Sequence, residues 1–377
     1  MSIIRQDPTT KEWVIIAAER TRRPHEYSRL THARPQPAET GSCPFCPGHE
    51  AATPEEVFRI PTLEGTGWAV RVTSNKYPAL GEVGGPERRE AGPLFREMDG
   101  VGVHEVIIET PVHERTLPLM TDHEVADVLT AYQARYRTLR EDRRLKYLII
   151  FKNHGEAAGT SLAHPHSQLV ATPVPPMLLR RKYEIAVAHY DDTGRCLYCD
   201  VAEEERRAKS RVVSETDLFL VFHPFASRVP FETWITPKRH QPSFAQVSAE
   251  DLHELALVLR RTLKGLYARL GDPDFNLIIH SAPIEDENKD YYLWHIQILP
   301  RLTTIAGFEL GSGIYVTTML PEESAATMRE YEQAFEREGP SDKGGTNYAA
   351  ESLSQPSLRG YASQRGELPD VDQRGIE

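Results

Sequence analysis

The sequence lacks long hydrophobic runs, and it has few cysteines and an excess of acidic residues. Its apolar stretches, such as YLIIF at 147–151, are far too short to cross a bilayer. The first residues, MSIIRQDPTTKEW, have no basic start followed by an apolar segment, so we expect no secretory signal and a cytoplasmic protein. The net charge of −11 argues against general binding to nucleic acid or anionic membrane, but it permits a local basic pocket for a phosphate.

The four cysteines form two C-x-x-C pairs, Cys43-Pro-Phe-Cys46 and Cys196-Leu-Tyr-Cys199. Without a secretory signal, such pairs indicate metal binding or redox chemistry rather than a disulfide framework. We expect neither pair to lie at the start of a helix, as the cysteines of thioredoxin-like proteins do, and this favours metal binding.

The chain falls into two halves that repeat one order of parts. Each half begins with C-x-x-C and continues through strand-like segments to a histidine, a capped helix, a strand and a second histidine. The helices are predicted at about 122–144 and 249–270, each after a capping-box pattern. This order indicates an internal duplication with a joint near 173–181. The predicted domains are 1–178 and 179–337, followed by a polar tail at 338–377 that we expect to be disordered.

Each half also supplies a set of thiolate and imidazole ligands of the kind that zinc prefers. We therefore expect two zinc ions per chain. The alternative is that the cysteines are buried as small apolar residues and the histidines are ordinary core or surface residues. His49 and His104 are spare candidates for the first site. The predicted ligands are Cys43, Cys46, His113 and His164 for the first site, and Cys196, Cys199, His240 and His295 for the second.

His166 is assigned a role different from that of His164. The two residues would face the same way in a strand, so one imidazole can bind the metal while the other stays free. A backbone carbonyl that accepts a proton from one ring nitrogen would leave the other nitrogen of His166 as a nucleophile. The second half has His295-Ile-Gln297 in the corresponding place, so we expect it to keep the ligand and lose the nucleophile.

The residues around His166 suggest a phosphate-containing substrate. Small side chains, hydroxyls and backbone N–H groups just before the motif suit phosphate, and amide side chains add further donors. Arginines near the N-terminus suit bidentate phosphate contacts. The candidates are Gly159, Thr160, Ser161, Ser167, Gln168, Asn153, Arg20 and Arg23.

The sequence His164-Pro-His-Ser-Gln168 resembles the active-site signature of the nucleotidyl-transferring branch of the histidine-triad superfamily, the galactose-1-phosphate uridylyltransferase family. The resemblance extends over most of the chain except the tail. It includes residues 20–24, the first C-x-x-C, Asn75 in TSNKYPAL, His113, Asn153, 159–161, Arg301, and GFELGSG at 307–313, which contains Phe308.

The resemblance implies an α+β fold of two histidine-triad-like domains, each an antiparallel sheet flanked by helices. It also implies a double displacement in which His166 takes a nucleotidyl group from a nucleotide sugar and passes it to a sugar phosphate. Ser161 and Gln168 would contact the transferring phosphoryl group. Asn75, Asn153, Gly159, Thr160, Phe308 and the two arginines would bind the substrate.

Two departures leave the reaction partly open. The cysteines of the second half and the GFELGSG segment look more like plant-type relatives that act as ADP-glucose phosphorylases. Uridylyl transfer between UDP-glucose and galactose 1-phosphate is the leading interpretation, and an ADP-sugar phosphorylase or adenylyltransferase is the alternative. A zinc-stabilised nucleotide-binding scaffold is the non-enzymatic alternative. As for assembly, a homodimer is compatible with the sequence.

Overall fold

The structure is a computed structural model that describes residues 2–20 and 40–338. The described residues up to 337 form one compact unit. The tail predicted to be disordered lies, apart from residue 338, outside the described residues. None of the described helices is long and apolar enough to cross a membrane.

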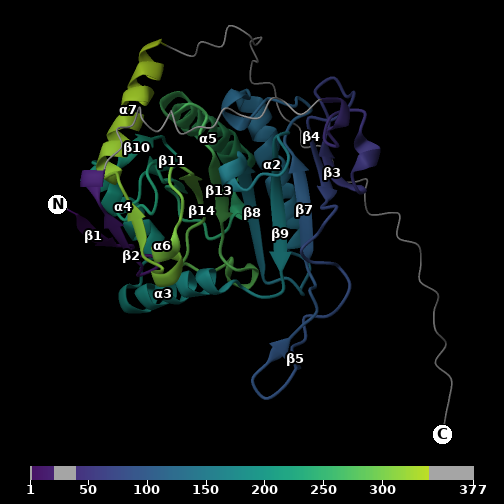
Figure 1. The fold of residues 1–377 in the computed structure, drawn as a ribbon, viewed down its shortest axis with the longest axis horizontal. Helices are drawn as coiled ribbons and strands as arrows, with labels where there is room; N and C mark the ends of the chain where they lie inside the picture. Colours follow the sequence, from purple (N-terminus) through teal and green to yellow (C-terminus); the bar gives the residue numbers. More distant parts are fainter. Residues whose placement is uncertain (1, 21–39, 339–377) are drawn as a thin grey trace, which may run out of the picture. The chain divides into compact units, whose positions relative to one another are not determined.

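The centre of the fold is a ten-stranded sheet in which every neighbouring pair is antiparallel (Figure 1). In spatial order its strands are β10 (Val212–Glu215), β11 (Phe219–Phe222), β12 (Thr233–Pro237), β14 (His295–Pro300), β13 (Phe275–His280), β8 (Tyr147–His154), β9 (His166–Thr172), β7 (Val103–Ile108), β4 (Val70–Ser74) and β3 (Glu56–Ile60).

The strand order is the same in both halves when it is followed outward from the middle. On one side it runs β8, β9, β7, β4, β3, and on the other β13, β14, β12, β11, β10. The two inner strands pair directly, with Asn153 opposite Asn276. This order confirms the predicted α+β fold with a repeated antiparallel unit. Because the sheet is continuous across the joint, the boundary near residue 178 stays a prediction.

One long helix from each half packs on this sheet. α2 (Asp122–Leu139) begins with the predicted capping box, in which Thr121 and Glu124 bond reciprocally. α5 (Ala249–Leu270) begins at a Ser248 cap and ends at Gly271, whose φ of +73° suits a residue without a side chain. The first helix is shorter than predicted, because Asp142 accepts the backbone N–H of Arg144 and turns the chain after Leu139.

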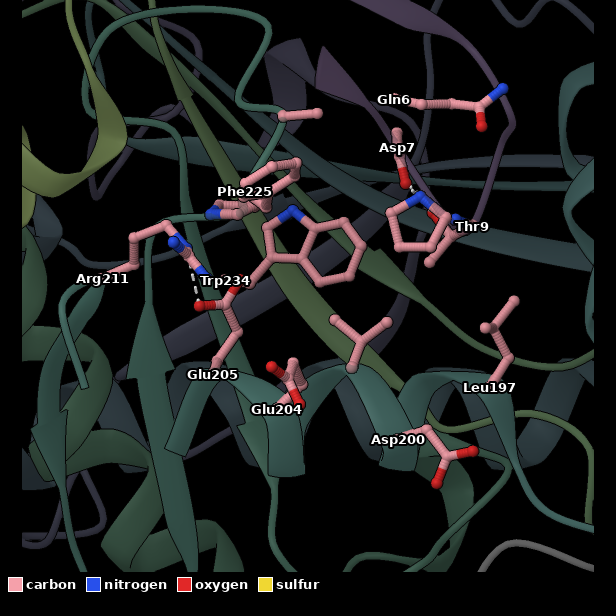
Figure 2. A pocket seen from close by; sticks show the side chains of 14 residues that line it. Gln6, Asp7, Thr9, Leu197, Asp200, Glu204, Glu205, Arg211, Phe225 and Trp234 are labelled. Carbon is pink, nitrogen blue, oxygen red and sulfur yellow. Dashed lines mark hydrogen bonds and ion pairs between the residues drawn. The ribbon is translucent and has the colours of Figure 1, made fainter. Parts of the chain in front are cut away.

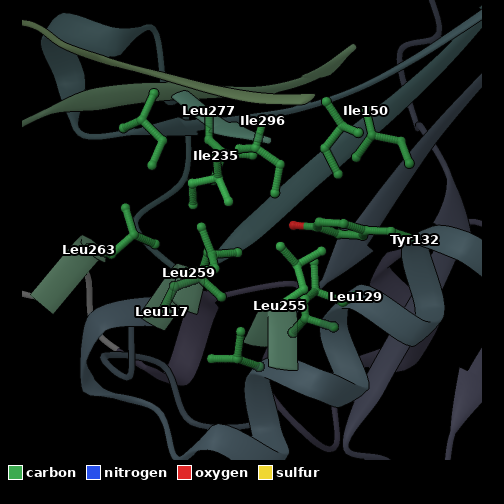
Figure 3. Packing of buried hydrophobic residues seen from close by; sticks show 14 of the residues in the cluster. Leu117, Leu129, Tyr132, Ile150, Ile235, Leu255, Leu259, Leu263, Leu277 and Ile296 are labelled. Carbon is green, nitrogen blue, oxygen red and sulfur yellow. The ribbon is translucent and has the colours of Figure 1, made fainter. Parts of the chain in front are cut away.

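The main core lies between these helices and the sheet (Figure 3). Leu129 and Tyr132 of α2 meet Leu255 and Leu259 of α5, beneath strand residues such as Ile296. Both helices thus turn a mainly apolar face toward the sheet. Each fully buried leucine contributes about 1.5–3 kcal/mol through removal of apolar surface from water.

The remaining elements surround this core. The strands are β1 (Ile3–Gln6), β2 (Trp13–Ile16) and β15 (Tyr315–Thr317) in a three-stranded sheet, and the short pair β5 (Arg89–Glu90) and β6 (Arg96–Glu97) between β4 and β7. The helices are α3 (Met177–Thr193), α4 (Leu197–Ala208), α6 (Gly307–Ser312) and α7 (Pro321–Glu338). The joint predicted at 173–181 thus includes the start of α3.

The core makes a direct prediction for α5. Leu259 is 1% exposed and Leu257, on the same helix, is 39% exposed. Leu259→Ala should lower the free energy of unfolding by about 2–5 kcal/mol, because it removes apolar contacts and leaves a cavity. Leu257→Ala should change it by less than about 0.5 kcal/mol. Urea denaturation of both variants measures the difference, and equal losses would show that this packing is not what holds α5.

Candidate functional site

His166 begins β9 and lies opposite Ile108 of β7. Its Nδ1 donates a hydrogen bond to the carbonyl oxygen of His164 at 2.9 Å. Among the described residues Nε2 has no hydrogen-bond partner, and the side chain lines a cleft. Burial lowers the pKa of His166, and the nearby Lys152 ammonium lowers it further. The ring is therefore neutral near pH 7, with its proton on Nδ1 and its lone pair on Nε2.

The cleft beside His166 has a volume of about 480 Å³. One wall comes from the first C-x-x-C segment, where Phe45 meets the His166 ring edge-on with centroids 5.4 Å apart. Another comes from the end of β4 and the residues after it, including the cationic Lys76. Four of the predicted residues line the cleft together: Asn75, Ser161, His166 and Gln168.

His104 holds Gln168 in place, a role that the sequence interpretation missed. The backbone N–H of Ala79 donates to His104 Nδ1 at 3.1 Å, so the ring proton is on Nε2. His104 Nε2 then donates to the side-chain oxygen of Gln168 at 2.7 Å. The Gln168 amide is left with its N–H groups free to donate into the cleft. His104 was considered only as a spare metal ligand, and the structure places it outside both Cys/His groups.

A buried ion pair lies behind the His166 strand. Lys152 Nζ donates to Glu109 at 2.7 Å and to the backbone oxygen of His166 at 3.1 Å. Tyr132 and Ser167 also donate to Glu109. Burial alone would raise the pKa of Glu109, but the Lys152 ammonium and these hydrogen bonds outweigh it and hold the pKa below its ordinary value. The network fixes the backbone that carries His166.

Asn153, Gly159 and Thr160 lie together next to the cleft without lining it. The Thr160 hydroxyl donates to the backbone oxygen of Asn153, and the Asn153 side-chain oxygen accepts from Asn276 of the other half at 2.8 Å. Gly159 has a φ of +88°, which favours glycine at this tight turn. Arg301 donates a hydrogen bond to the side-chain oxygen of Asn276 at 2.6 Å. Arg301 therefore supports Asn153 indirectly, through Asn276.

The predicted ligands of the first metal site come together near the start of β9. Cys43, Cys46, His113 and His164 have their ligand atoms within 4.8 Å of one another. The Sγ of Cys46 lies 3.3 Å from Nδ1 of His113 and 3.6 Å from Nδ1 of His164. Tetrahedral zinc separates sulfur and nitrogen ligands by about 3.6 Å. His164 Nε2 donates to the backbone oxygen of Thr110 at 2.7 Å, which leaves Nδ1 free to bind the metal.

A second group contains Cys196, Cys199 and His240, and it does not include His295. Cys199 Sγ lies 3.2 Å from Nδ1 of His240. Both groups thus fit a metal by donor type and distance. The expectation that neither C-x-x-C lies at a helix start is wrong for this pair, because Cys196 is the N-cap of α4. Its sulfur accepts the Cys199 N–H there, and a helix N-terminus favours a thiolate.

Three predicted substrate residues are not placed at the cleft. One lies elsewhere, and the side chains of the other two are not described. Phe308 is on α6, is 53% exposed and does not line the cleft. Arg20 ends a short 3-10 helix at Ala18–Arg20, and only its backbone is described. Arg23 lies outside the described residues. Their substrate contacts remain predictions.

A second cavity, of about 550 Å³, lies between residues 6–9 and the second half, and it has a different character (Figure 2). Its apolar floor includes Trp234 and Phe225. Its charged side chains are Arg211, which is bound to Glu205 at 2.8 Å, and four carboxylates, Asp7, Asp200, Glu204 and Glu205. Carboxylates repel a polyphosphate. The cleft beside His166 is therefore the better site for a nucleotide.

Comparison with known proteins agrees with this geometry. A family profile described as "Galactose-1-phosphate uridyl transferase, N-terminal domain" matches residues 1–176, and "Domain of unknown function (DUF4921)" matches residues 119–344. An ADP-glucose phosphorylase from Arabidopsis thaliana is 34% identical over 87% of this chain and 92% of its own. A galactose-1-phosphate uridylyltransferase from Thermotoga maritima is 32% identical over 88% of this chain and 99% of its own.

The chain belongs to the galactose-1-phosphate uridylyltransferase family. Its fold matches the crystal structure of an ADP-glucose phosphorylase from Arabidopsis thaliana with bound ADP-glucose at a TM-score of 0.74, with 32% identity over 88% of this chain and 99% of that one. A uridylyltransferase structure matches at 0.68, with 30% identity over 89% and 99%. This is a family of enzymes, so the scaffold alternative is set aside.

The ion pair behind His166 can be tested by removing its charges singly and together. Lys152→Met leaves the Glu109 carboxylate buried without its cation, and this should cost about 3–5 kcal/mol of stability. The double variant Lys152→Met/Glu109→Gln removes both charges and should recover most of that loss. Urea denaturation measures both variants. A single variant as stable as the wild type would show that the pair does not hold this part of the sheet.

Proposed function

We propose that this protein transfers a nucleotidyl group from a nucleotide sugar through a covalent intermediate on His166. The observation that carries the proposal is the geometry of that ring. Nδ1 is occupied by the His164 carbonyl at 2.9 Å, and Nε2 faces a cleft large enough for a nucleotide. Simple binding does not need an imidazole with its lone pair held toward the ligand.

In the first step Nε2 of His166 attacks the α-phosphorus of the nucleotide sugar. The N–P bond forms as the bond from that phosphorus to the bridging oxygen breaks, and hexose 1-phosphate leaves with the electron pair. The Nδ1 proton stays on the ring, and the His164 carbonyl stabilises the positive charge that develops there. In the second step a phosphate oxygen of the acceptor attacks the same phosphorus, and the N–P bond breaks.

The residues of the cleft suit the charge of that reaction. The amide N–H groups of Gln168, oriented by His104, and the Ser161 hydroxyl would donate to oxygens of the transferring group. Lys76 supplies a cation at the cleft, where it would attract the remaining phosphate. Asn75, Asn153, Gly159, Thr160, Phe308, Arg20 and Arg23 are retained as proposed substrate residues.

For the substrate, we propose uridylyl transfer between UDP-glucose and galactose 1-phosphate. The uridylyltransferases similar to this chain include several from bacteria, yeasts and animals. A second candidate is an ADP-glucose phosphorylase, in which inorganic phosphate accepts the adenylyl group. The observation that favours it is the similarity to the Arabidopsis enzyme both in sequence and in fold.

The proposed cofactor is zinc, one ion at each Cys/His group. The first group joins the segment that carries Phe45 to the strand of His166, so its metal would act by holding the wall of the cleft against the nucleophile. Zinc bound there supplies folding free energy rather than a reactive group. His295 was predicted as a ligand of the second ion, but among the described residues it is not part of that group.

The zinc proposal predicts a loss of stability with limited loss of chemistry. Cys43→Ser should release one of two zinc equivalents and lower the melting temperature, because the loop loses its attachment to β9. The fraction that stays folded should keep most of its activity, since Cys43 does not line the cleft. Metal analysis and thermal unfolding of wild type and variant check this. A fully folded protein without zinc would contradict it.

The covalent step predicts product release without an acceptor. Wild-type protein mixed with UDP-glucose alone should release about one hexose 1-phosphate per active site, and ADP-glucose should not replace it. His166→Gly should release none, because the nucleophile is gone. Free imidazole added to that variant could fill the space and restore release. His253→Ala, at an exposed position of α5, is the matched control and should behave as wild type.

Each other outcome has a defined meaning. Release with ADP-glucose and not with UDP-glucose keeps the mechanism and selects the phosphorylase. Release by His166→Gly at the wild-type level without imidazole assigns the nucleophile elsewhere. The absence of release by wild type with either nucleotide sugar, while turnover proceeds once an acceptor is added, would show direct transfer and overturn the covalent mechanism.

A further inference from the structure

The second Cys/His group has one protein ligand fewer than the first. Among the described residues it contains Cys196, Cys199 and His240, whereas the first group contains four ligands. The three ligands of the second group correspond in order to Cys43, Cys46 and His113. The member with no counterpart is His164, so the question is which residue occupies that place in the second half.

The repeat itself answers the question. His113 and His240 are 127 positions apart, as are the helix caps Thr121 and Ser248. Gln168 of β9 lies opposite Phe151 of β8, and Gln297 of β14 lies opposite Ile278 of β13. Ile278 is again 127 positions beyond Phe151. Gln297 therefore corresponds to Gln168 and not to His166.

A hydrogen bond gives the same alignment independently. His166 Nδ1 donates to the carbonyl of the residue two positions earlier, His164, at 2.9 Å. His295 Nδ1 donates in the same way to the carbonyl of Leu293 at 3.1 Å. Each histidine also begins its strand, β9 or β14. His295 is thus the counterpart of His166, and Leu293 stands where the first half has the ligand His164.

Leu293 cannot bind a metal, and among the described residues the group has no fourth ligand in its place. Leu293 is 1% exposed and packs in the same buried cluster as Cys196. An apolar side chain therefore stands where the first half has His164, and the fourth coordination position has no protein ligand. The His295 ring lies outside the group, stacked against Trp234 with centroids 4.5 Å apart and against Tyr198 at 5.2 Å. Its Nδ1 is already bonded to a carbonyl.

The carboxylates near the group are also engaged or badly placed. Asp290 approaches Nε2 of His240 at 4.0 Å, on the opposite side of the ring from the Nδ1 atom that faces Cys199. Asp200, next to Cys199, is bound by Arg195 and by His189. Cys199 and His240 are only partly buried, so small molecules from solvent can reach the fourth position.

We propose that the second group binds zinc through Cys196, Cys199 and His240 alone, with its fourth position open to an exchangeable small ligand such as water, a thiol or an imidazole. The inference rests on the proposed zinc binding and adds that the two sites differ. Three protein ligands with an open position are otherwise characteristic of zinc sites that take up external ligands. The first site, with four, is closed.

Cobalt provides the test, because the visible absorption of Co²⁺ reports its coordination. The zinc of the full chain is exchanged for Co²⁺, and imidazole is then added. One of two cobalt equivalents should change its spectrum. His240→Ala should lose that equivalent and leave the other unresponsive. Two equivalents that both ignore imidazole would overturn the proposal, as would a chain that binds metal only at the first group.

Substitutions at Leu293 test whether this position corresponds to the fourth ligand of the first group. Leu293→His supplies the missing ligand and should abolish the imidazole response, whereas Leu293→Phe, which introduces a ring without a ligand atom, should keep it. A response unchanged in a folded Leu293→His chain counts against the proposal. If that variant does not fold, the wild-type titration still decides. Failure of zinc binding at both groups would instead refute the zinc proposal itself, while leaving the His166 chemistry testable by product release.

Discussion

The hydrogen bond between His166 Nδ1 and the His164 carbonyl is the interaction on which the active site depends. The bond links the proposed nucleophile to a proposed metal ligand, because His164 directs its own Nδ1 toward the first Cys/His group. The same strand is held from behind by Lys152, whose ammonium donates to the His166 carbonyl and neutralises buried Glu109. Nε2 of His166, the proposed nucleophile, is therefore positioned by the backbone, by the loop of the first Cys/His group and by an ion pair together, before any substrate arrives.

The repeated half shows that this geometry alone does not make an active site. His295 has the same bond to the carbonyl two residues earlier, but its ring is fully buried between aromatic side chains. The cavity that this half shares with residues 6–9 has four carboxylates and one arginine in its lining, and this excess of negative charge disfavours a nucleotide. Access to the histidine and the charge of the cavity therefore explain why chemistry is proposed for the first half alone. The shared sheet lets the second half support the first, since Asn276 donates to Asn153.

The parts that could be predicted from sequence are those with local patterns. The capping residues and helical spacing located α5 at its observed ends, and H-P-H-S-Q identified His166 through its neighbours in sequence. His104 and the Glu109–Lys152 pair were missed because their partners lie far away in sequence and meet only across strands. His295 was matched to His164 because both seemed to be the first histidine of a pattern. Pairing register in the sheet shifts that match by two residues and reveals Leu293 in the ligand position.

The most direct test of the central claim is the site of covalent attachment. The intact chain, quenched after mixing with UDP-glucose or ADP-glucose, should gain the mass of one nucleotidyl group, and peptide analysis should place it on His166. The bond should be labile in acid and stable in base, as expected for a nitrogen–phosphorus bond. A nucleotidyl group found on another residue, or an active enzyme that never carries one, would contradict the account.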